Sequence, residues 1–581
     1  MNHSHRTTPA RLTEQAATKL PRSILIGVGL VYIFAGLFFR DPWKSDDVIG
    51  IATMLSAVHE STNSWFLPAI GDFSYTQDGP LATLLGALSI VVLGPFFALF
   101  QSPLDASITA ARLPNLLWFL VLTFCFWRAL FILAQTRGAQ PLALPFGGEP
   151  NKQDYARMIA DAGLLLLVAT VGIIWRIHET SAVPLSLMLC AVLFYAWVLS
   201  PKQPRTAAVL MGLALGGSFL NRGLIAYIPL VAASLAVFIR LMPYRRYRRY
   251  FFFGLLFSLA IGGAWLIAAW SSDPRWVQQW WQGQIKLIQG VNDYSLSKHA
   301  RDLLWFLWPT WPLALLSVWN WRKWLNAPHI ALAAYLAAFS LLLLLFMPQA
   351  SEGEYIFLAL PSAILAAFAL PTLRRGAINA LDWFAVMCFS LTAATVWLGW
   401  VAQQTGWPPK IARSIHRQTE GFDADIVWWA LAIALIGTVL WVLLVRWRLS
   451  RRPPSLWRGT VLSAAGLITT WLLLVTLWMP TLNYARSYRT VATELAQALA
   501  LHNPRGDCVY ADINNGQRAS FYVFAQLKFS SHRYCSLWLQ ETSPKLSLEE
   551  RNRNIPAHTQ LLWQGRRGGD RNELFRLLRT P

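Results

Sequence analysis

Apolar stretches long enough to cross a lipid bilayer recur along most of this 581-residue sequence. The hydrocarbon core of a bilayer is about 30 Å thick, so one straight crossing needs about 20 helical residues. Only 14% of the residues are charged, against about 25% in soluble domains. These features predict an all-α polytopic membrane protein with about 12–14 transmembrane helices. The predicted segments are 23–39, 82–100, 113–134, 162–177, 182–199, 207–220, 224–239, 251–270, 302–320, 329–347, 356–371, 383–402, 427–445 and 459–479.

Short basic clusters between these segments determine the predicted orientation. Residues 240–249 and 446–452 form the strongest clusters, and Lys202, Arg322 and Arg374 mark further basic turns. Such clusters are typical of cytoplasmic loops, so the net charge of +21 needs no nucleic-acid partner. The N-terminus is therefore expected in the cytoplasm and the C-terminal region outside it.

This orientation divides the chain into three parts. Residues 1–22 form a cytoplasmic tail, residues 23–479 a transmembrane domain, and residues 480–581 an external domain. The transmembrane domain carries two long external loops, 40–81 and 271–301. The mixed apolar and polar pattern of both loops predicts helices that lie on the membrane surface.

The segment 82–100 does not fit the alternation of sides. Counting back from Lys202, it begins and ends outside the cytoplasm. Either Gly94-Pro95 turns the chain in a re-entrant or interfacial element, or a further crossing lies within 48–70. The remaining alternative is that another predicted segment is wrong.

The external domain has the pattern of a small α/β fold. Two of the five cysteines, Cys508 and Cys535, lie in it. Outside the cytoplasm they would be able to form a disulfide, but the sequence does not give their distance and both states stay open. The predicted helices are 488–501 and 517–527, and the predicted strands are 508–511, 533–539 and 559–564.

An acidic pair, Asp46-Asp47, follows the first apolar segment in the motif Arg40-Asp41-Pro42-Trp43-Lys44-Ser45-Asp46-Asp47. Two adjacent carboxylates at a membrane surface are costly to desolvate unless they face a polar cavity, a cation or a substrate. A carboxylate held against an acceptor group can remove its proton. Tyr75 and Asp78, at the end of the same loop, are candidates to face the same cavity. A solvated loop and an ordinary turn are the alternatives.

Several short motifs, in their order along the chain, resemble those of a known family. They are the acidic pair, Tyr75-Thr76-Gln77-Asp78-Gly79-Pro80-Leu81, Ala111-Arg112-Leu113-Pro114, Leu220-Asn221-Arg222-Gly223, Pro348-Gln349-Ala350-Ser351-Glu352-Gly353-Glu354-Tyr355 and Asn483-Tyr484-Ala485-Arg486-Ser487-Tyr488-Arg489. The arrangement resembles the membrane GT-C glycosyltransferases, in the branch of the lipid A aminoarabinose transferases and the protein O-mannosyltransferases. The resemblance extends over nearly the whole chain.

The resemblance implies transfer of a sugar from a polyprenyl-phosphate donor to a lipid, glycan or protein acceptor. The site would face the periplasm from a bacterial inner membrane, with Asp46 as catalytic base and Asp47 as its partner. It implies binding roles for other residues, which are Tyr75, Asp78, His178, Glu179, Arg222 and Tyr355. A divalent cation held by Asp46, His178 and Glu179 is a further candidate, although no recognised metal motif is present. The alternative function is a transporter or flippase of lipid-linked substrates.

Two positions depart from the family pattern. Asp78 stands where the family has a lysine before its proline, and Glu352 stands near another usual lysine. A donor phosphate still needs cations beside it. We expect Arg222 to be the principal one; the other external candidates are Arg275, Lys298 and Arg301.

Overall fold

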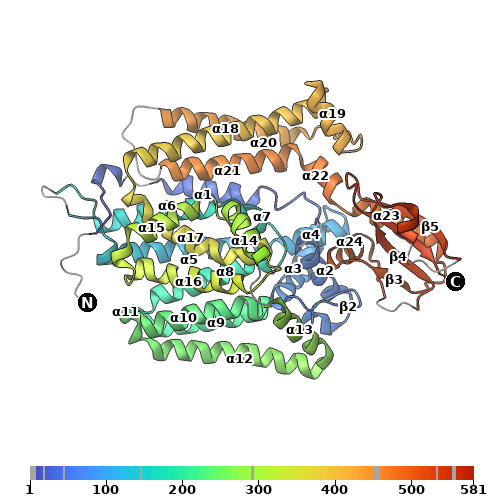
Figure 1. Ribbon diagram of the computed structural model, residues 1–581, viewed down its shortest axis with the longest axis horizontal. Coiled ribbons are helices and arrows are strands. Elements are labelled where there is room, and N and C mark those ends of the chain that lie inside the picture. The colour runs from blue at the N-terminus through green and yellow to red at the C-terminus, as the bar shows by residue number, and fades with distance from the viewer. Residues whose placement is uncertain are drawn as a thin grey trace.

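The computed structural model is a helical bundle with a small α/β domain at one end (Figure 1). It describes residues 8–17, 20–43, 46–143, 147–288, 293–449, 458–530, 534–552 and 558–580. Lys44, Ser45, Arg451, Arg452 and Arg533, which belong to predicted motifs, lie outside these ranges.

The bundle is built from helices of very different lengths. They are α1 (Arg22–Phe34), α5 (Pro114–Ala134), α6 (Lys152–Val168), α7 (Val171–Arg176), α8 (Ala182–Leu199), α9 (Pro204–Arg222), α10 (Leu224–Arg240), α12 (Arg248–Ser272), α15 (Thr310–Asn320), α16 (Pro328–Leu345), α17 (Glu352–Ala369), α18 (Arg375–Thr405), α20 (Trp428–Leu449) and α21 (Arg458–Leu477). Within the described residues, eight helical stretches are long and apolar enough to cross a membrane. This confirms the predicted multi-pass class.

Two of these helices form the centre of the bundle. α8 and α17 are buried along almost their whole length, whereas α12, α18 and α20 leave most of their apolar side chains at least partly exposed. Exposed apolar surface of this extent is typical of contact with lipid. Figure 1 shows α18, α20 and α21 on one side of the centre and α9, α10 and α12 on the other.

The basic cluster 240–249 lies far from the C-terminal domain. It includes the short helix α11 (Met242–Arg245), which Figure 1 places at the end of the bundle away from the C-terminal domain. The basic cluster and the C-terminal domain therefore lie at opposite ends of the bundle.

The first long loop folds into short helices at the other end. They are α2 (Asp46–His59), α3 (Leu81–Phe97) and α4 (Pro103–Arg112), with a small hairpin of β1 (Ala69–Ile70) and β2 (Phe73–Ser74) between α2 and α3. α3 and α4 form a helical hairpin in which the Ser89 hydroxyl donates to the Ala110 carbonyl at 2.6 Å. The chain before α3 contacts Arg222, and Asp105 in α4 contacts Arg489. Both ends of the segment 82–100 thus lie at the same end of the bundle, which agrees with a re-entrant or interfacial element.

The second long loop contains α13 (Pro274–Leu287) and α14 (Asp293–Phe306). The interfacial pattern predicted here places Trp276, Trp280 and Trp281 on one helix, but only Trp281 is exposed. Trp276 and Trp280 are buried against Trp265 of α12. Much of the aromatic character of this helix therefore serves packing.

The C-terminal domain is a four-stranded mixed sheet with helices beside it. Its elements are α22 (Met479–Arg486), α23 (Arg489–His502), β3 (Val509–Asp512), α24 (Asn515–Ala525), β4 (Leu537–Thr542), α25 (Leu548–Asn552), β5 (Gln560–Gly565) and β6 (Leu574–Arg579). The strand order is β3-β4-β6-β5, and β3 and β4 are parallel. The predicted strand 533–539 lies at Leu537–Thr542 instead, and the buried strand β6 was not predicted. Cys508 and Cys535 form a disulfide with their Cα atoms 5.2 Å apart.

Hydrogen bonds and an ion pair connect this domain directly to the segment that leads into α2. The Asn483 side-chain oxygen accepts from the Asp41 amide and from the Trp43 indole, each at 3.1 Å. Ser487 donates to the Asp41 carboxylate at 2.7 Å, and Arg489 pairs with it at the same distance. Side chains more than 400 positions apart in the sequence therefore fix the entry to α2.

Candidate active site

Asp46 and Asp47 begin α2, where the loop between α7 and α8 approaches closely. A Cβ atom on Gly50 would lie 1.8 Å from the Thr180 carbonyl oxygen, and one on Gly79 would lie 2.1 Å from the Leu220 carbonyl oxygen. Only glycine permits these two contacts. They bring the first loop against the ends of the α7–α8 loop and of α9.

Asp46 has an accessible carboxylate with one ion-pair partner among the described residues. Its side chain is 39% exposed, and its Oδ2 atom lies 3.1 Å from Arg176 Nη1. Arg176 also pairs with Glu179 at 2.9 Å and with Glu352 at 3.1 Å. One guanidinium therefore joins three carboxylates from three separate elements.

Asp47 has a different environment. Its side chain is only 4% exposed, and it pairs with Arg40 at 2.9 Å and with Arg112 at 3.4 Å. It also accepts from the Thr180 amide at 2.7 Å. Burial alone would raise the pKa of Asp47, but Arg40, Arg112 and the Thr180 amide outweigh it and hold the pKa below its ordinary value. Asp47 is thus a buried, ionised residue that positions the start of α2.

Tyr75, Asp78 and Arg222 meet as the sequence predicted. Asp78 accepts from Tyr75 Oη at 3.1 Å and pairs with Arg222 Nε at 3.2 Å. Arg222 Nη2 lies 2.6 Å from Glu354. Burial raises the pKa of Asp78 and, together with the Asp78 charge, that of Tyr75.

This second cluster lies next to Asp46. A Cβ atom on Gly353 would be 3.6 Å from Asp46 Oδ2 and 3.4 Å from Arg222 Nη1. A small cavity of about 20 Å³ lies between Asp46, Tyr75 and Asp78. Of the predicted carboxylates, those of Asp78 and Glu179 therefore lie near the accessible carboxylate of Asp46.

His178 does not join them. Its Nδ1 atom lies 2.5 Å from the Ile174 carbonyl oxygen and its Nε2 atom 2.8 Å from that of Tyr32, and burial lowers its pKa to about 4. Asp46 and Glu179 are linked through Arg176, which donates hydrogen bonds to both carboxylates. Among the described residues, no three His, Cys, Asp or Glu side chains are arranged to hold a metal ion. The structure thus does not bring the three residues of the candidate metal set, Asp46, His178 and Glu179, together around one position.

Glu179 is buried against Arg176. Burial raises the pKa of Glu179 to about 8, and the nearby charges of Asp46 and Asp47 act in the same direction, although Arg176 opposes them. The site therefore contains one carboxyl group that is mostly neutral at pH 7.

The remaining predicted residues, Tyr355, Arg275, Lys298 and Arg301, have contacts elsewhere in the molecule. Tyr355 Oη lies 2.7 Å from His299 Nδ1, inside the packing between α14 and α17. Lys298 donates to the Ala350 carbonyl, and Arg275 and Arg301 are exposed on the surface. None of these three cations contacts the acidic cluster.

A cavity of about 770 Å³ opens beside Arg176 and Glu352. Its walls are mainly aromatic and aliphatic, and its polar lining includes Asp302 and Arg486. Trp43 and Trp175, which stack with their centroids 5.1 Å apart, lie in the wall with Trp305 and Trp471. The charged end of the cavity holds two guanidiniums, of Arg176 and Arg486, and two carboxylates, of Asp302 and Glu352. A largely apolar cavity with charged groups at one end suits a long hydrocarbon chain with a charged head.

Sequence reasoning missed Arg176 and Arg486. Both stand at the C-terminal ends of short helices on the side away from the basic loops, where the positive-inside rule does not favour a cation. An arginine at such a position is a signal that points to a local anionic partner.

Comparisons with known proteins place this geometry in a known architecture. No protein-family model and no curated protein sequence matches the chain. The crystal structure of ArnT from Cupriavidus metallidurans bound to undecaprenyl phosphate matches with a TM-score of 0.62 and 13% identity, over 96% of this chain and 97% of that chain. The chain has the ArnT fold. The apo structure of ArnT matches over the same shares with a TM-score of 0.62 and 14% identity.

This match confirms the fold that the resemblance implied. ArnT is a GT-C lipid A aminoarabinose transferase, the branch that the sequence motifs resemble. The ArnT fold accounts for the helical bundle and the small C-terminal sheet together, since nearly the whole of both chains aligns.

Proposed function

We propose that this chain is an integral membrane glycosyltransferase that moves a sugar from a polyprenyl-phosphate donor to an acceptor. The acceptor is a lipid, a glycan or a protein on the periplasmic face of a bacterial inner membrane. The observation that carries the proposal is an accessible carboxylate, Asp46, beside the charged end of an aromatic-walled cavity. The likeness to ArnT, solved with undecaprenyl phosphate bound, supports the donor class.

In the proposed reaction, an acceptor hydroxyl or amine attacks the anomeric carbon of the donor sugar. Asp46 takes the acceptor proton as the new bond forms. The bond between the anomeric carbon and the phosphate oxygen breaks, and the polyprenyl phosphate leaves with that electron pair. Asp46 suits this role because its carboxylate is accessible while Arg176 fixes its direction.

The large cavity is the proposed site of the prenyl chain. Trp43, Trp175 and Trp471 provide apolar walls, and Arg176 and Arg486 are placed to balance the charge of the leaving phosphate. Arg222, which we expected to bind this phosphate, does not line this cavity and pairs instead with Asp78 and Glu354. In the proposal it fixes these two carboxylates, which accept hydrogen bonds from sugar hydroxyls.

A transporter is the weaker candidate. Transporters place their functional charges near the middle of the membrane, often at broken helices related by an internal repeat. Here the charged clusters of Asp46 and Arg222 lie at helix ends on one side of the bundle. An enzyme that works at the membrane surface fits this placement better.

The test is transfer of radiolabelled sugar from synthetic polyprenyl-phosphate donors to a panel of lipid, glycan and protein acceptors. Asp46→Asn should lower the rate by roughly 10²–10⁴-fold, the usual contribution of a general base. Asp72→Asn is the matched control, because Asp72 belongs to the same loop but is 74% exposed and contacts Lys528. Full activity of Asp46→Asn would exclude the proposed base, and transfer by neither protein with any donor would exclude the function.

A further inference from the structure

The end of the bundle away from the C-terminal domain carries a group of exposed cations. They belong to the turn between α8 and α9 and to the segment from the end of α10 to the start of α12. Tyr247 Oη donates to the Pro201 carbonyl at 3.3 Å and thereby joins these two parts. We call the group the basic patch, and its members are Lys202, Arg205, Arg240, Arg245, Arg246, Arg248 and Arg249.

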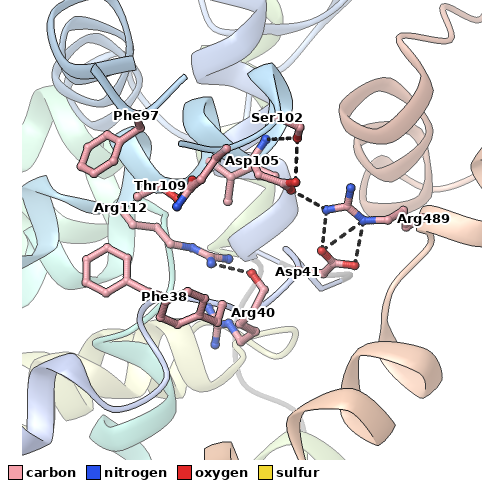
Figure 2. Close-up of a pocket in the computed structure, with 12 residues that line it drawn as sticks. Phe38, Arg40, Asp41, Phe97, Ser102, Asp105, Thr109, Arg112 and Arg489 are labelled. Carbon is pink, nitrogen blue, oxygen red and sulfur yellow. Dashed lines mark hydrogen bonds and ion pairs between the residues drawn. The ribbon is translucent and has the colours of Figure 1, made fainter. Parts of the chain in front are cut away.

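The basic patch has no carboxylates to balance its charge. At the other end of the bundle, the partly exposed Arg489 pairs with both Asp41 and Asp105 (Figure 2). By contrast, no ion pair joins the basic patch to a carboxylate within the described residues, and the sequence has no Asp or Glu between Glu179 and Asp273. The helix α16, which packs against α10, has no acidic residue either. Seven positive charges therefore lie together at the surface without a negative one.

Aromatic rings orient part of the basic patch. The guanidinium of Arg246 lies 5.0 Å from the ring centroid of Tyr247, and that of Arg249 lies 4.8 Å from that of Tyr250. Tyr244 is buried, so the short helix α11 is anchored in the core beneath the exposed arginines. These contacts hold the side chains but leave their charge unbalanced. A concentrated charge of one sign at a surface attracts ligands of the other sign.

Exposed apolar side chains continue from the basic patch along two helices. Spacings of three or four residues place such side chains on one side of a helix. On α9, Arg205 is followed at these spacings by exposed Val209 and Leu213. On α12, Arg249 is followed in the same way by exposed Phe253 and Leu256. Each helix thus presents a cation at its start and apolar surface beyond it.

The helices α9 and α12 pack tightly against each other (Figure 1). A Cβ atom on Gly254 would lie 2.7 Å from the Ala208 carbonyl oxygen, so only glycine permits this approach. Both helices begin at the basic patch and run in the same direction. The two apolar series therefore start at the same level, and exposed apolar surface of this kind on a membrane protein contacts lipid tails.

We infer that the basic patch binds an anionic glycerophospholipid of the surrounding bilayer. The phosphate lies against the guanidiniums of Arg205, Arg248 and Arg249, and the acyl chains lie along the apolar series of α9 and α12. A phosphate diester accepts charge-assisted hydrogen bonds from guanidinium groups. Cations clustered beside a membrane span attract anionic headgroups in this way. This inference does not depend on the transferase proposal.

The headgroup charge is the property that the experiment varies. Phosphatidylglycerol has a net negative charge, whereas the ammonium of phosphatidylethanolamine cancels the charge of its phosphate and is repelled by the patch. The purified full-length chain is placed in nanodiscs with equal amounts of the two lipids, and the lipids that it retains are identified by native mass spectrometry. One cation near an anionic surface contributes roughly fivefold in binding. Phosphatidylglycerol should therefore be retained at least about fivefold over phosphatidylethanolamine.

A pair of triple variants tests the assigned position. Arg205→Gln with Arg248→Gln and Arg249→Gln should remove this preference, while the four remaining cations of the patch keep the segment positive. The same three positions changed to Lys keep the charge and should keep the preference. No preference in the unmodified chain, an unchanged preference in the Gln variant, or equal losses in both variants would each overturn the inference.

A second measurement needs no variant. Phosphatidylglycerol that carries a photoreactive group at the start of an acyl chain should label peptides that contain Val209 or Phe253, and phosphatidylethanolamine with the same group should label them at least about fivefold less. Equal labelling by the two lipids would show contact with bulk lipid alone and would also overturn the inference. Loss of sugar transfer would leave both results unchanged, so the two proposals fail separately.

Discussion

Two neighbouring carboxylates of the same type lie in opposite environments in this protein. Asp46 is partly exposed and shares Arg176 with two other carboxylates, so cations are scarce around it. Asp47 is buried and has two arginines and a backbone amide to itself. The surroundings of Asp46 thus have more negative than positive charge, and its carboxylate is accessible. The surroundings of Asp47 have more positive than negative charge, and its carboxylate is buried.

This difference gives two adjacent residues of α2 different proposed roles, a reactive one for Asp46 and a structural one for Asp47. A carboxylate with a full set of buried donors is held ionised and cannot approach a substrate. A carboxylate with one partner at the edge of a cavity can exchange that partner for an acceptor group. We therefore propose that Asp47 positions Asp46, and three experiments test this proposal and the site around it.

The largest effect is expected for Asp47→Asn. It leaves Arg40 and Arg112 buried with no carboxylate between them, and loss of one member of a buried ion pair typically costs about 3–5 kcal/mol. The unfolding midpoint in detergent, followed by tryptophan fluorescence, should fall clearly below that of the unmodified chain. Asp46→Asn is the matched control and should leave the midpoint nearly unchanged; equal midpoints for both variants would contradict the division.

A smaller effect is expected for Arg176→Gln. Two charge-assisted hydrogen bonds to a phosphate contribute about 3 kcal/mol, which corresponds to roughly a 100-fold loss of kcat/KM for the donor. Arg301→Gln serves as control, because Arg301 is 74% exposed and was only a sequence-based candidate. If both variants lose activity equally, Arg176 has no special place beside the donor.

The smallest effect is a dependence on pH. Glu179 has a pKa of about 8, so it is mostly neutral below pH 8 and gains a negative charge as the pH rises through that value. The added charge beside Arg176 should weaken phosphate binding, and the donor KM should rise a few-fold between pH 7 and 9, as a rough expectation for one nearby charge. Glu179→Gln stays neutral and should show no such rise; the same rise in this variant would assign it to another group.

The sequence carried enough information for the fold class and for the neighbourhood of the site. Apolar segment lengths predicted the bundle, and the order of short motifs pointed to the correct fold at an identity to ArnT of only 13%. Asp46, Tyr75, Asp78, Glu179 and Arg222 belong to the network that the structure assembles.

What the sequence could not separate depends on contacts between distant segments. Asp46 and Asp47 are identical neighbours, and only Arg40, Arg112 and Thr180 distinguish them. The sequence could not show that both ring nitrogens of His178 are bound to main-chain carbonyls, because every residue has such a carbonyl. His178 was therefore predicted to be a ligand. The strand β6 was not predicted, because Arg576 interrupts its apolar residues. It forms a strand through its pairing with β4 and β5.

The bonds from Asn483, Ser487 and Arg489 to Asp41 and Trp43 set an order of events during biosynthesis. The ribosome completes the segment around Asp46 early, but the side chains that fix its approach are made more than 400 residues later. Until that final region has been made and has folded, the acidic loop lacks its outer supports. A chain shortened before Asn483 would keep each of the proposed site residues named above except Arg486 and still lack these outer supports. Under the proposed function, half-made copies would therefore not act on the lipids around them.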